Sequence, residues 1–440
     1  MALDPNLYIH ESDKAALDTL KAIPGFTPLI RSLMKSWNEN QFRILNMSSR
    51  LRLSEEQLPR YYEMLGPICQ KLGIEVPELY LELNVTPNAY TYGDTNPFIV
   101  VTSGLLESLP EELIPTVLAH ECGHIACHHT LYRTMGQMIL GGTMAIPGAG
   151  TLISLPLKTA FAYWMRCSEY SADRAAILCD GSAENVIEMC MRLSGYIKTI
   201  PDEASKEGFL SQATEYRQMI NDSKWNQTME FMILASQSHP LTAVRAYEAR
   251  EWAQSEDVSH LFTYMKETES GGHHTSIPLS QSASSFLGKD HLIIKERLEQ
   301  DGFVNIKSVR SYEGTGTPGS VTDISIGGIH DIAEHTWVSC DAPVILTYYE
   351  PLSLEELRTL YPDQVFTPFS SAGCTGKGAE EVIQAFEGAG FTNLIPIRYE
   401  GNRPFLAREG SVRAVRIADQ DSFQENTGFK AEEPVRIIFY

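Results

Sequence analysis

The chain has 440 residues, more than a single hydrophobic core usually serves, so we expect two or three domains. Its hydrophobic content of 43% and charged content of 21% are ordinary for a globular protein and argue against wholesale disorder. The formal net charge of -21 argues against a nucleic-acid-binding protein, which needs a basic face to neutralise phosphates.

The cysteines and the first residues bear on the cellular location. The eight cysteines form no CxxC pair and no regular framework. In a chain of this length they indicate reduced thiols, and we therefore predict a cytoplasmic protein. The first twenty residues have neither the basic nor the apolar stretch of a signal peptide.

The first hundred residues change from helical to strand-like patterns. Residues 11–85 are predicted to be mostly helical, because apolar residues recur at three- and four-residue intervals in 13–20 and 51–72. Within residues 78–101, the runs LYLELNV and FIVVTSG predict two strands. The sequence between them, PNAYTYGDTNP, is rich in turn-forming residues.

The stretch His120-Glu121-Cys122-Gly123-His124 follows on a predicted helix. Its two histidines are four residues apart, so they project from one face and can reach one metal ion. Glu121 points at a different angle, which suits it to act on a metal-activated water. Cys122 points about 200° away from His120, and we expect it to be structural. A surface helix with two histidines is the alternative interpretation.

Residues 136–165 are largely uncharged, but Gly141-Gly142 and Pro147 divide them into two pieces. Each piece is shorter than the roughly 20 residues that a membrane-spanning helix needs. We therefore predict a buried or surface-apposed apolar hairpin. Contact with a membrane is the less favoured alternative.

A second strong helix is predicted over residues 160–179. A catalytic zinc site requires three protein ligands and an open position for water. Glu169 and Asp173 lie four residues apart on one face of this helix and are candidates for completing the site. The alternative is a solvent-facing pair of acids beside Arg166 and Arg174.

Residues 266–289 are rich in Ser, Gly and Thr without periodicity and are predicted to be a linker. The remaining chain contains an internal repeat, assigned to residues 290–350 and, with a connector, 351–440. Matching landmarks are Gly302-Phe303 with Gly390-Phe391, Gly319-Ser320-Val321 with Gly410-Ser411-Val412, and Pro343-Val344 with Pro434-Val435. Each copy is predicted to be a helix followed by strands, and carries no cluster of metal-ligating residues. The copies resemble PASTA-type repeats and are interpreted as binding or scaffolding modules.

Three separated motifs together support a family resemblance. HECGH is followed by Glu169 and Asp173 in the pattern R-x-x-E-x-x-A-D-x-x-A, and then by SHPLTAVR. With Asn88-Ala89-Tyr90 ahead of the motif helix, residues 5–255 resemble the HtpX-like and CAAX-prenyl-endopeptidase family of zinc metallopeptidases. The resemblance implies an α+β protein with a mainly helical, zincin-type peptidase domain over residues 1–265 and a small β-sheet. Two small α/β repeat domains would follow it.

The resemblance also implies a role for each motif residue. One zinc ion (Zn2+) would be held by His120, His124 and Glu169, with Glu121 as the general base. Asp173 would accept a hydrogen bond from a ligand imidazole and orient it.

Two further groups of residues would lie at the cleft. His239 and Arg245 would lie over it and stabilise the oxyanion, although a helix-capping role for His239 is weighed equally. Asn88, Ala89 and Tyr90 would lie on an edge strand that pairs with the backbone of an extended peptide.

These expectations combine into a zinc endopeptidase that acts on polypeptides. Many relatives span the membrane, whereas this sequence has no apolar helix of spanning length before the motif, so it resembles the soluble branch. The alternative is a catalytically silent or latent metallopeptidase-like protein that holds a partner with its C-terminal repeats. The intact Glu121 argues against a silent enzyme, which has no chemical need for it.

Overall fold

The computed structural model describes residues 3–36, 39–141, 155–197, 199–200, 203–234, 241–313, 316–402, 404 and 407–440. Its α-helices are α1 (Glu11–Ala22), α2 (Phe26–Ser36), α3 (Glu39–Ser49), α4 (Pro59–Tyr62), α5 (Leu65–Leu72), α6 (Ser103–Ser108), α7 (Ile114–Ala126), α8 (Thr130–Leu140), α9 (Leu155–Asp180), α10 (Glu184–Leu193), α11 (Lys206–Asn221), α12 (Lys224–Leu234), α13 (Thr242–Ala253), α14 (Glu256–Ser270), α15 (His291–Asp301), α16 (Leu354–Leu360), α17 (Ser371–Cys374) and α18 (Ala379–Gly388).

The strands are short and form several small sheets, so the fold is mixed α+β, as predicted. They are β1 (Leu51–Leu53), β2 (Glu78–Glu82), β3 (Ala89–Tyr92), β4 (Phe98–Thr102), β5 (Ser276–Pro278), β6 (Ile306–Ser311), β7 (Val321–Ile326), β8 (Trp337–Ser339), β9 (Val344–Tyr349), β10 (Val365–Phe366), β11 (Leu394–Arg398), β12 (Val412–Ile417), β13 (Gly428–Phe429) and β14 (Val435–Phe439).

The chain forms two compact units, each described here by itself. The first contains residues 1–282 with 300–305 and 332–342, and the second contains residues 283–299, 306–331 and 343–440. The first unit holds helices α1 to α14 and a four-stranded sheet of order β1-β2-β4-β3. In that sheet β2 and β4 are parallel, β1 and β3 are antiparallel to their neighbours, and β3 forms an edge.

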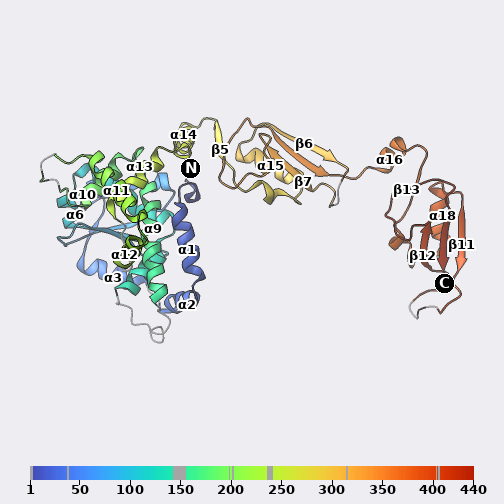
Figure 1. The fold of residues 1–440 in the computed structure, drawn as a ribbon, viewed down its shortest axis with the longest axis horizontal. Coiled ribbons are helices and arrows are strands. Elements are labelled where there is room, and N and C mark those ends of the chain that lie inside the picture. The colour runs from blue at the N-terminus through green and yellow to red at the C-terminus, as the bar shows by residue number, and fades with distance from the viewer. Residues whose placement is uncertain are drawn as a thin grey trace. The chain divides into compact units, whose positions relative to one another are not determined.

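The two helices that carry the sequence motifs pack directly on each other. Helix α7 contacts α9, and α1 also contacts α9 and lies beside it (Figure 1). Pro115 occupies the first turn of α7, where its missing N–H costs nothing, so the helix begins there and continues through the motif. Apolar residues of α5, α7, α9 and α10 form the main core, which includes Cys122. The structural role expected for Cys122 is therefore confirmed.

All eight cysteines lie among the described residues and are free thiols, in agreement with the reduced state predicted for them. Seven of the eight are buried, and only Cys179 is partly exposed. Their contribution is therefore to packing.

The predicted apolar hairpin is described at both ends. In α8 and α9, Met135, Ile139, Leu157 and Phe161 are buried in a core shared with α1 and α2. The connecting residues 142–154 lie outside the described residues. In the described part of the chain, the search for a helix long and apolar enough to cross a membrane found none.

Two local predictions differ from the structure. Residues 51–53, predicted as helix, form β1, because their backbone pairs with β2 in an antiparallel register. The segment 266–289, predicted as a linker, contains the end of α14 and strand β5, which pairs with β8. Ile277 and Leu279 are buried there, but a strand of three residues is too short to show a period in the sequence.

The C-terminal part contains two segments with one strand arrangement. In one segment α15 precedes a sheet of order β6-β9-β7, and in the other α18 precedes a sheet of order β11-β14-β12. The first strand of each sheet is parallel to the middle strand and the remaining strand is antiparallel to it. Both antiparallel pairs have an irregularity at the same place, between Val321 and Asp323 and between Val412 and Ala414.

Gly123 sets how closely α7 approaches α9. A Cβ at this position would lie 2.7 Å from the Cβ of Ala175 and 3.1 Å from the Cα of Ala172. Such distances are too short for carbon atoms, so any larger residue separates the helices. The small residues on both sides therefore allow the close contact.

We predict that Gly123→Ala lowers the free energy of unfolding of the first unit by about 1–3 kcal/mol, because the added methyl overpacks this contact. Urea unfolding followed by tryptophan fluorescence measures it, since the four tryptophans among the described residues lie in the first unit. Gly66→Ala is the control, because its Cβ would meet no atom within 4 Å. Equal stability of the two variants would contradict the prediction.

Candidate metal centre

His120 and His124 face one point from the same side of α7. Both side chains are buried, and their ring centroids are 4.9 Å apart at an interplanar angle of 85°. The helical spacing of four residues therefore brings the two rings together, as the sequence predicted. The buried environment excludes the alternative of a surface helix with two solvated histidines.

Glu169 of α9 completes the cluster. Its carboxylate oxygens lie 3.4 Å from His120 Nε2 and 3.5 Å from His124 Nε2. One ligand atom from each of these three residues lies within 4.8 Å of the others, and all three residues are buried. The alternative of a solvent-facing acid pair is therefore excluded for Glu169 and Asp173, which is buried as well.

Two arginines neutralise the buried Glu169 carboxylate. Arg133 Nη1 lies 2.7 Å from Glu169 Oε1, and Arg245 Nη1 lies 3.1 Å from Glu169 Oε2. Burial alone would raise the pKa of Glu169, but the charges of the two arginines outweigh it and hold this pKa well below its usual range. The carboxylate is therefore ionised and can act as a ligand.

Asp173 lies behind His120. Its Oδ1 is 2.9 Å from His120 Nδ1, and Arg245 donates to both of its carboxylate oxygens at 2.8 and 2.6 Å. Burial opposes ionisation of Asp173, but Arg245 lowers its pKa below the usual value. An ionised Asp173 accepts from His120 Nδ1–H, which turns the Nε2 lone pair of His120 toward Glu169.

A second chain of hydrogen bonds runs behind His124. Its Nδ1 is 3.1 Å from His129 Nδ1, and His129 Nε2 is 2.9 Å from Asp13 Oδ2 on α1. Because Asp13 accepts from His129 Nε2–H, the Nδ1 of His129 is left as the acceptor for His124 Nδ1–H. Trp164 and Ser171 also donate to Asp13, at 2.9 and 2.6 Å. These hydrogen bonds fix His124 in the tautomer that carries its proton on Nδ1 and none on Nε2.

These residues fit a divalent metal ion. Within the described part of the chain, His124 Nε2 is buried and has no hydrogen-bond partner. Burial, reinforced by Arg133, lowers the pKa of His124 well below its usual range, so the ring is neutral. Burial and Arg245 act to lower the pKa of His120, but Asp173 and Glu169 raise it to about 9, so a metal ion competes with a proton for this ring. Two imidazoles and one carboxylate could hold the metal.

Glu121 faces a small cavity beside the cluster. The cavity has a volume of about 220 Å³ and is lined by Glu121 together with His120 and Glu169. Thr91 of β3 donates its hydroxyl to Glu121 Oε2 at 2.6 Å, which fixes the orientation of the carboxylate. Glu121 therefore lies next to the three candidate ligands without being one of them.

Of the other predicted site residues, some line this cavity and others do not. Asn88, Ala89 and Arg245 line the same cavity, so the structure brings them to the cluster. Tyr90 does not line it, because its hydroxyl donates to Glu82 at 2.7 Å. His239 lies outside the described residues.

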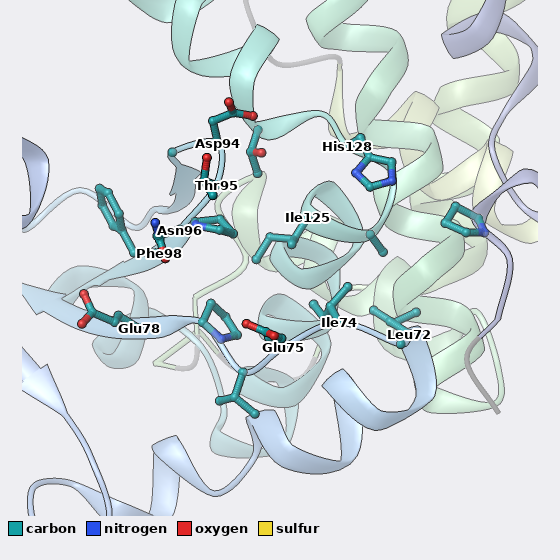
Figure 2. Close-up of a pocket in the computed structure, with 18 of the residues that line it drawn as sticks. Leu72, Ile74, Glu75, Glu78, Asp94, Thr95, Asn96, Phe98, Ile125 and His128 are labelled. Carbon is teal, nitrogen blue, oxygen red and sulfur yellow. The ribbon is translucent and has the colours of Figure 1, made fainter. Parts of the chain in front are cut away.

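A cavity of greater volume lies elsewhere in the first unit. It has a volume of about 860 Å³ and lies beside the C-terminal end of α7, where Ile125 and His128 face Ile74 and Glu75 across it (Figure 2). None of the candidate ligands lines it. The chemistry of the cluster therefore points to the smaller cavity as the site.

Comparisons with known proteins agree with the cluster. The family model "Peptidase family M48" matches residues 63–253. The chain is 32% identical over 265 residues to "Plastoglobule-localized metallopeptidase 48, chloroplastic" of Arabidopsis thaliana, an alignment that covers 59% of this chain and 76% of the relative. The chain belongs to peptidase family M48. The resemblance inferred from HECGH and the two later motifs is therefore confirmed.

Two further comparisons are more distant. The chain is 28% identical over 120 residues to a "Protease HtpX homolog" of Thermococcus sibiricus, which is 27% of this chain and 41% of the relative. The crystal structure of Ste24p from S. mikatae is 18% identical, with a TM-score of 0.30, over 56% of this chain and 61% of that one. M48 proteins are metallopeptidases. This chain therefore belongs to a family of metalloproteases, which act on polypeptides.

Three residues that contact the M48 motif residues, and one that reaches them through His129, were not predicted from the sequence. They are Asp13, Thr91, His129 and Arg133. His129 could have been noticed, because it follows HECGH by five residues. Asp13, Thr91 and Arg133 reach the site only through tertiary packing of α1, β3 and α8, and no spacing in the sequence indicates them.

We predict that Asp13→Asn weakens metal binding roughly 10- to 100-fold, the usual effect of changing a residue that orients a metal ligand. The amide keeps only one acceptor oxygen for the three donors of Trp164, Ser171 and His129. Competition for Zn2+ with a chelating dye measures the affinity. Asp18→Asn, an exposed change of the same charge on α1, is the control, and equal affinities of the two variants would rule out the role of Asp13.

Proposed function

We propose that this chain is a zinc-dependent endopeptidase. The observation that carries the proposal is the buried cluster of His120, His124 and Glu169 with Glu121 beside it at one cavity. Two imidazoles and a carboxylate suit zinc better than the hard cations magnesium or calcium, and three ligands leave a position open for substrate or water.

In the proposed reaction the metal would supply Lewis acidity, polarising the scissile carbonyl and acidifying water. His120, His124 and Glu169 hold it. Glu121, oriented by the hydroxyl of Thr91, accepts a proton from the attacking water at its carboxylate and returns it to the leaving amine. The apolar walls of the cavity, which include Val117 and Leu105, limit the access of bulk water.

Arg245 is assigned a positioning role in this proposal. Its guanidinium is occupied by Asp173 and Glu169, so it holds the two acids in place and balances their charge. Stabilisation of the oxyanion by Arg245 and by His239 stays a prediction.

The edge strand β3 is the proposed place for the backbone of the substrate. The backbone N–H and C=O groups of Asn88 are hydrogen-bonded to Thr102 of β4. Because bonding alternates along an antiparallel pair, the N–H and C=O groups of Ala89 and Thr91 point to the open edge. An extended peptide that pairs with this edge would pass the cavity that holds Glu121.

The two C-terminal segments are proposed to be repeat domains that recruit or position substrates. Their common strand order and common irregularity support a repeat, and their resemblance to PASTA modules stays a prediction. The cytoplasmic location also stays a prediction, since the relative from Arabidopsis thaliana is named for chloroplast plastoglobules.

We predict that Glu121→Gln reduces peptide turnover by at least about 100- to 10,000-fold while zinc stays bound, because the amide cannot take the proton. His124→Ala should instead lose the zinc. Casein cleavage and metal analysis of the purified proteins distinguish the two effects. The exposed Glu112→Gln is the matched control. Full activity of Glu121→Gln would refute Glu121 as the base, and absence of cleavage by the zinc-loaded wild type would favour a silent binding protein.

We also predict that Ala89→Pro raises KM for peptides several-fold, since it removes one outward N–H that is worth about 1 kcal/mol. Proline is tolerated at the start of an edge strand whose N–H faces outward, so the fold and the bound zinc should persist. Steady-state kinetics with a fluorogenic peptide give KM and kcat separately. An unchanged KM would show that the substrate does not pair with β3.

A further inference from the structure

A second cavity adjoins the one that holds Glu121. It has a volume of about 680 Å³ and lies among the ends of α10, α11 and α13. Thr242 lines both cavities. Leu193, the last residue of α10, lines the smaller cavity, and the next residue, Ser194, lines the larger one. The two cavities are therefore neighbours across the first residue of α13.

The described lining of the larger cavity carries no formal charge. None of the described residues that line it is Asp, Glu, Lys or Arg, although such residues make up 21% of the chain. Its wall includes three aromatic rings, those of Tyr196, Phe209 and Tyr216, and the buried Met191. A charged side chain that entered it would lose its hydration without gaining a partner, which costs several kcal/mol.

Four hydroxyl groups of this wall are bonded within the protein. Ser194 and Thr242 are hydrogen-bonded to each other, and Ser205 accepts from the backbone N–H of Gly208 as the N-cap of α11. The hydroxyl of Tyr216 donates to Glu230. Apart from the side chains of Gln212 and Tyr196, the rest of the described lining is mainly apolar and aromatic.

We propose that this cavity is a specificity pocket that takes a bulky apolar side chain of the substrate, preferably an aromatic one. The proposal rests on the proposed peptidase function and adds the side-chain class that it selects. An extended peptide advances about 3.3 Å per residue, so a side chain a few residues from the scissile bond reaches past Thr242 into the pocket. Aromatic rings favour edge or offset contacts with Tyr196, Phe209 and Tyr216.

Ala243 offers a way to fill the pocket without touching the metal cluster. It lines the larger cavity and not the smaller one. The test compares two fluorogenic peptides that differ only by Phe or Ala at the position that a peptide-library digest identifies. We expect Ala243→Phe to lower the Phe-to-Ala ratio of kcat/KM roughly 10- to 100-fold. The milder Phe209→Leu should lower it less, and Ala15→Phe, exposed on α1, should keep the wild-type ratio.

A binding experiment tests the pocket independently of turnover. Zinc-loaded Glu121→Gln protein is titrated with heptapeptides of Ala and Ser that carry a single Phe at each position in turn. One register should bind at least several-fold more tightly than the others, and adding Ala243→Phe should abolish the difference. Absence of any Phe preference, or a preference that Ala243→Phe leaves intact, overturns the pocket. If the wild-type protein binds the peptides with this preference but cleaves none of them, the result would overturn the proposed peptidase function and leave the pocket intact.

Discussion

The negative charge of Glu169 is the constraint around which the first unit is built. A buried carboxylate without partners is costly, and here it is balanced by Arg133 from α8 and Arg245 from α13. Each arginine has further partners, since Arg133 donates to Ser168 and Arg245 donates to Asp173. Two helices, α8 and α13, are thus tied to α9 through one side chain. Removal of either arginine would leave a buried charge only half compensated, with a cost of several kcal/mol.

The same network also prepares the two imidazoles. Each ring has one nitrogen engaged by a partner behind it, Asp173 for His120 and His129 for His124. Their remaining nitrogens converge on the carboxylate of Glu169. The site is therefore ordered by the protein itself, so little conformational entropy is lost on metal binding. The glycine in the motif has a matching role, because its lack of a Cβ lets α7 come close enough to α9 for these distances.

The site was predictable from the sequence as far as it depends on helical periodicity. The four-residue spacings of His120 with His124 and of Glu169 with Asp173 define one face each, and the motif order indicated that the faces meet. Asp13 and Thr91 carry no such signal, because they reach the cluster from an N-terminal helix and an edge strand. In the fold, β2 and β4 were readable as apolar runs. Strands β1 and β5 were not, since three residues are too few to show a period and these strands are stabilised by pairing partners distant in the sequence.

The hydrogen bond from His129 to Asp13 and the ion pairs of Arg245 join residues that are far apart in the sequence and are therefore synthesised at different times. Asp13 precedes Arg245 in the chain by more than two hundred residues. The charge of Glu169 is balanced by both arginines only after α13 has emerged and folded back onto α9. A nascent chain that stops short of that point has the three candidate ligands and Arg133 but lacks Arg245. The proposed peptidase activity would therefore begin only after the chain has been extended well beyond the motif.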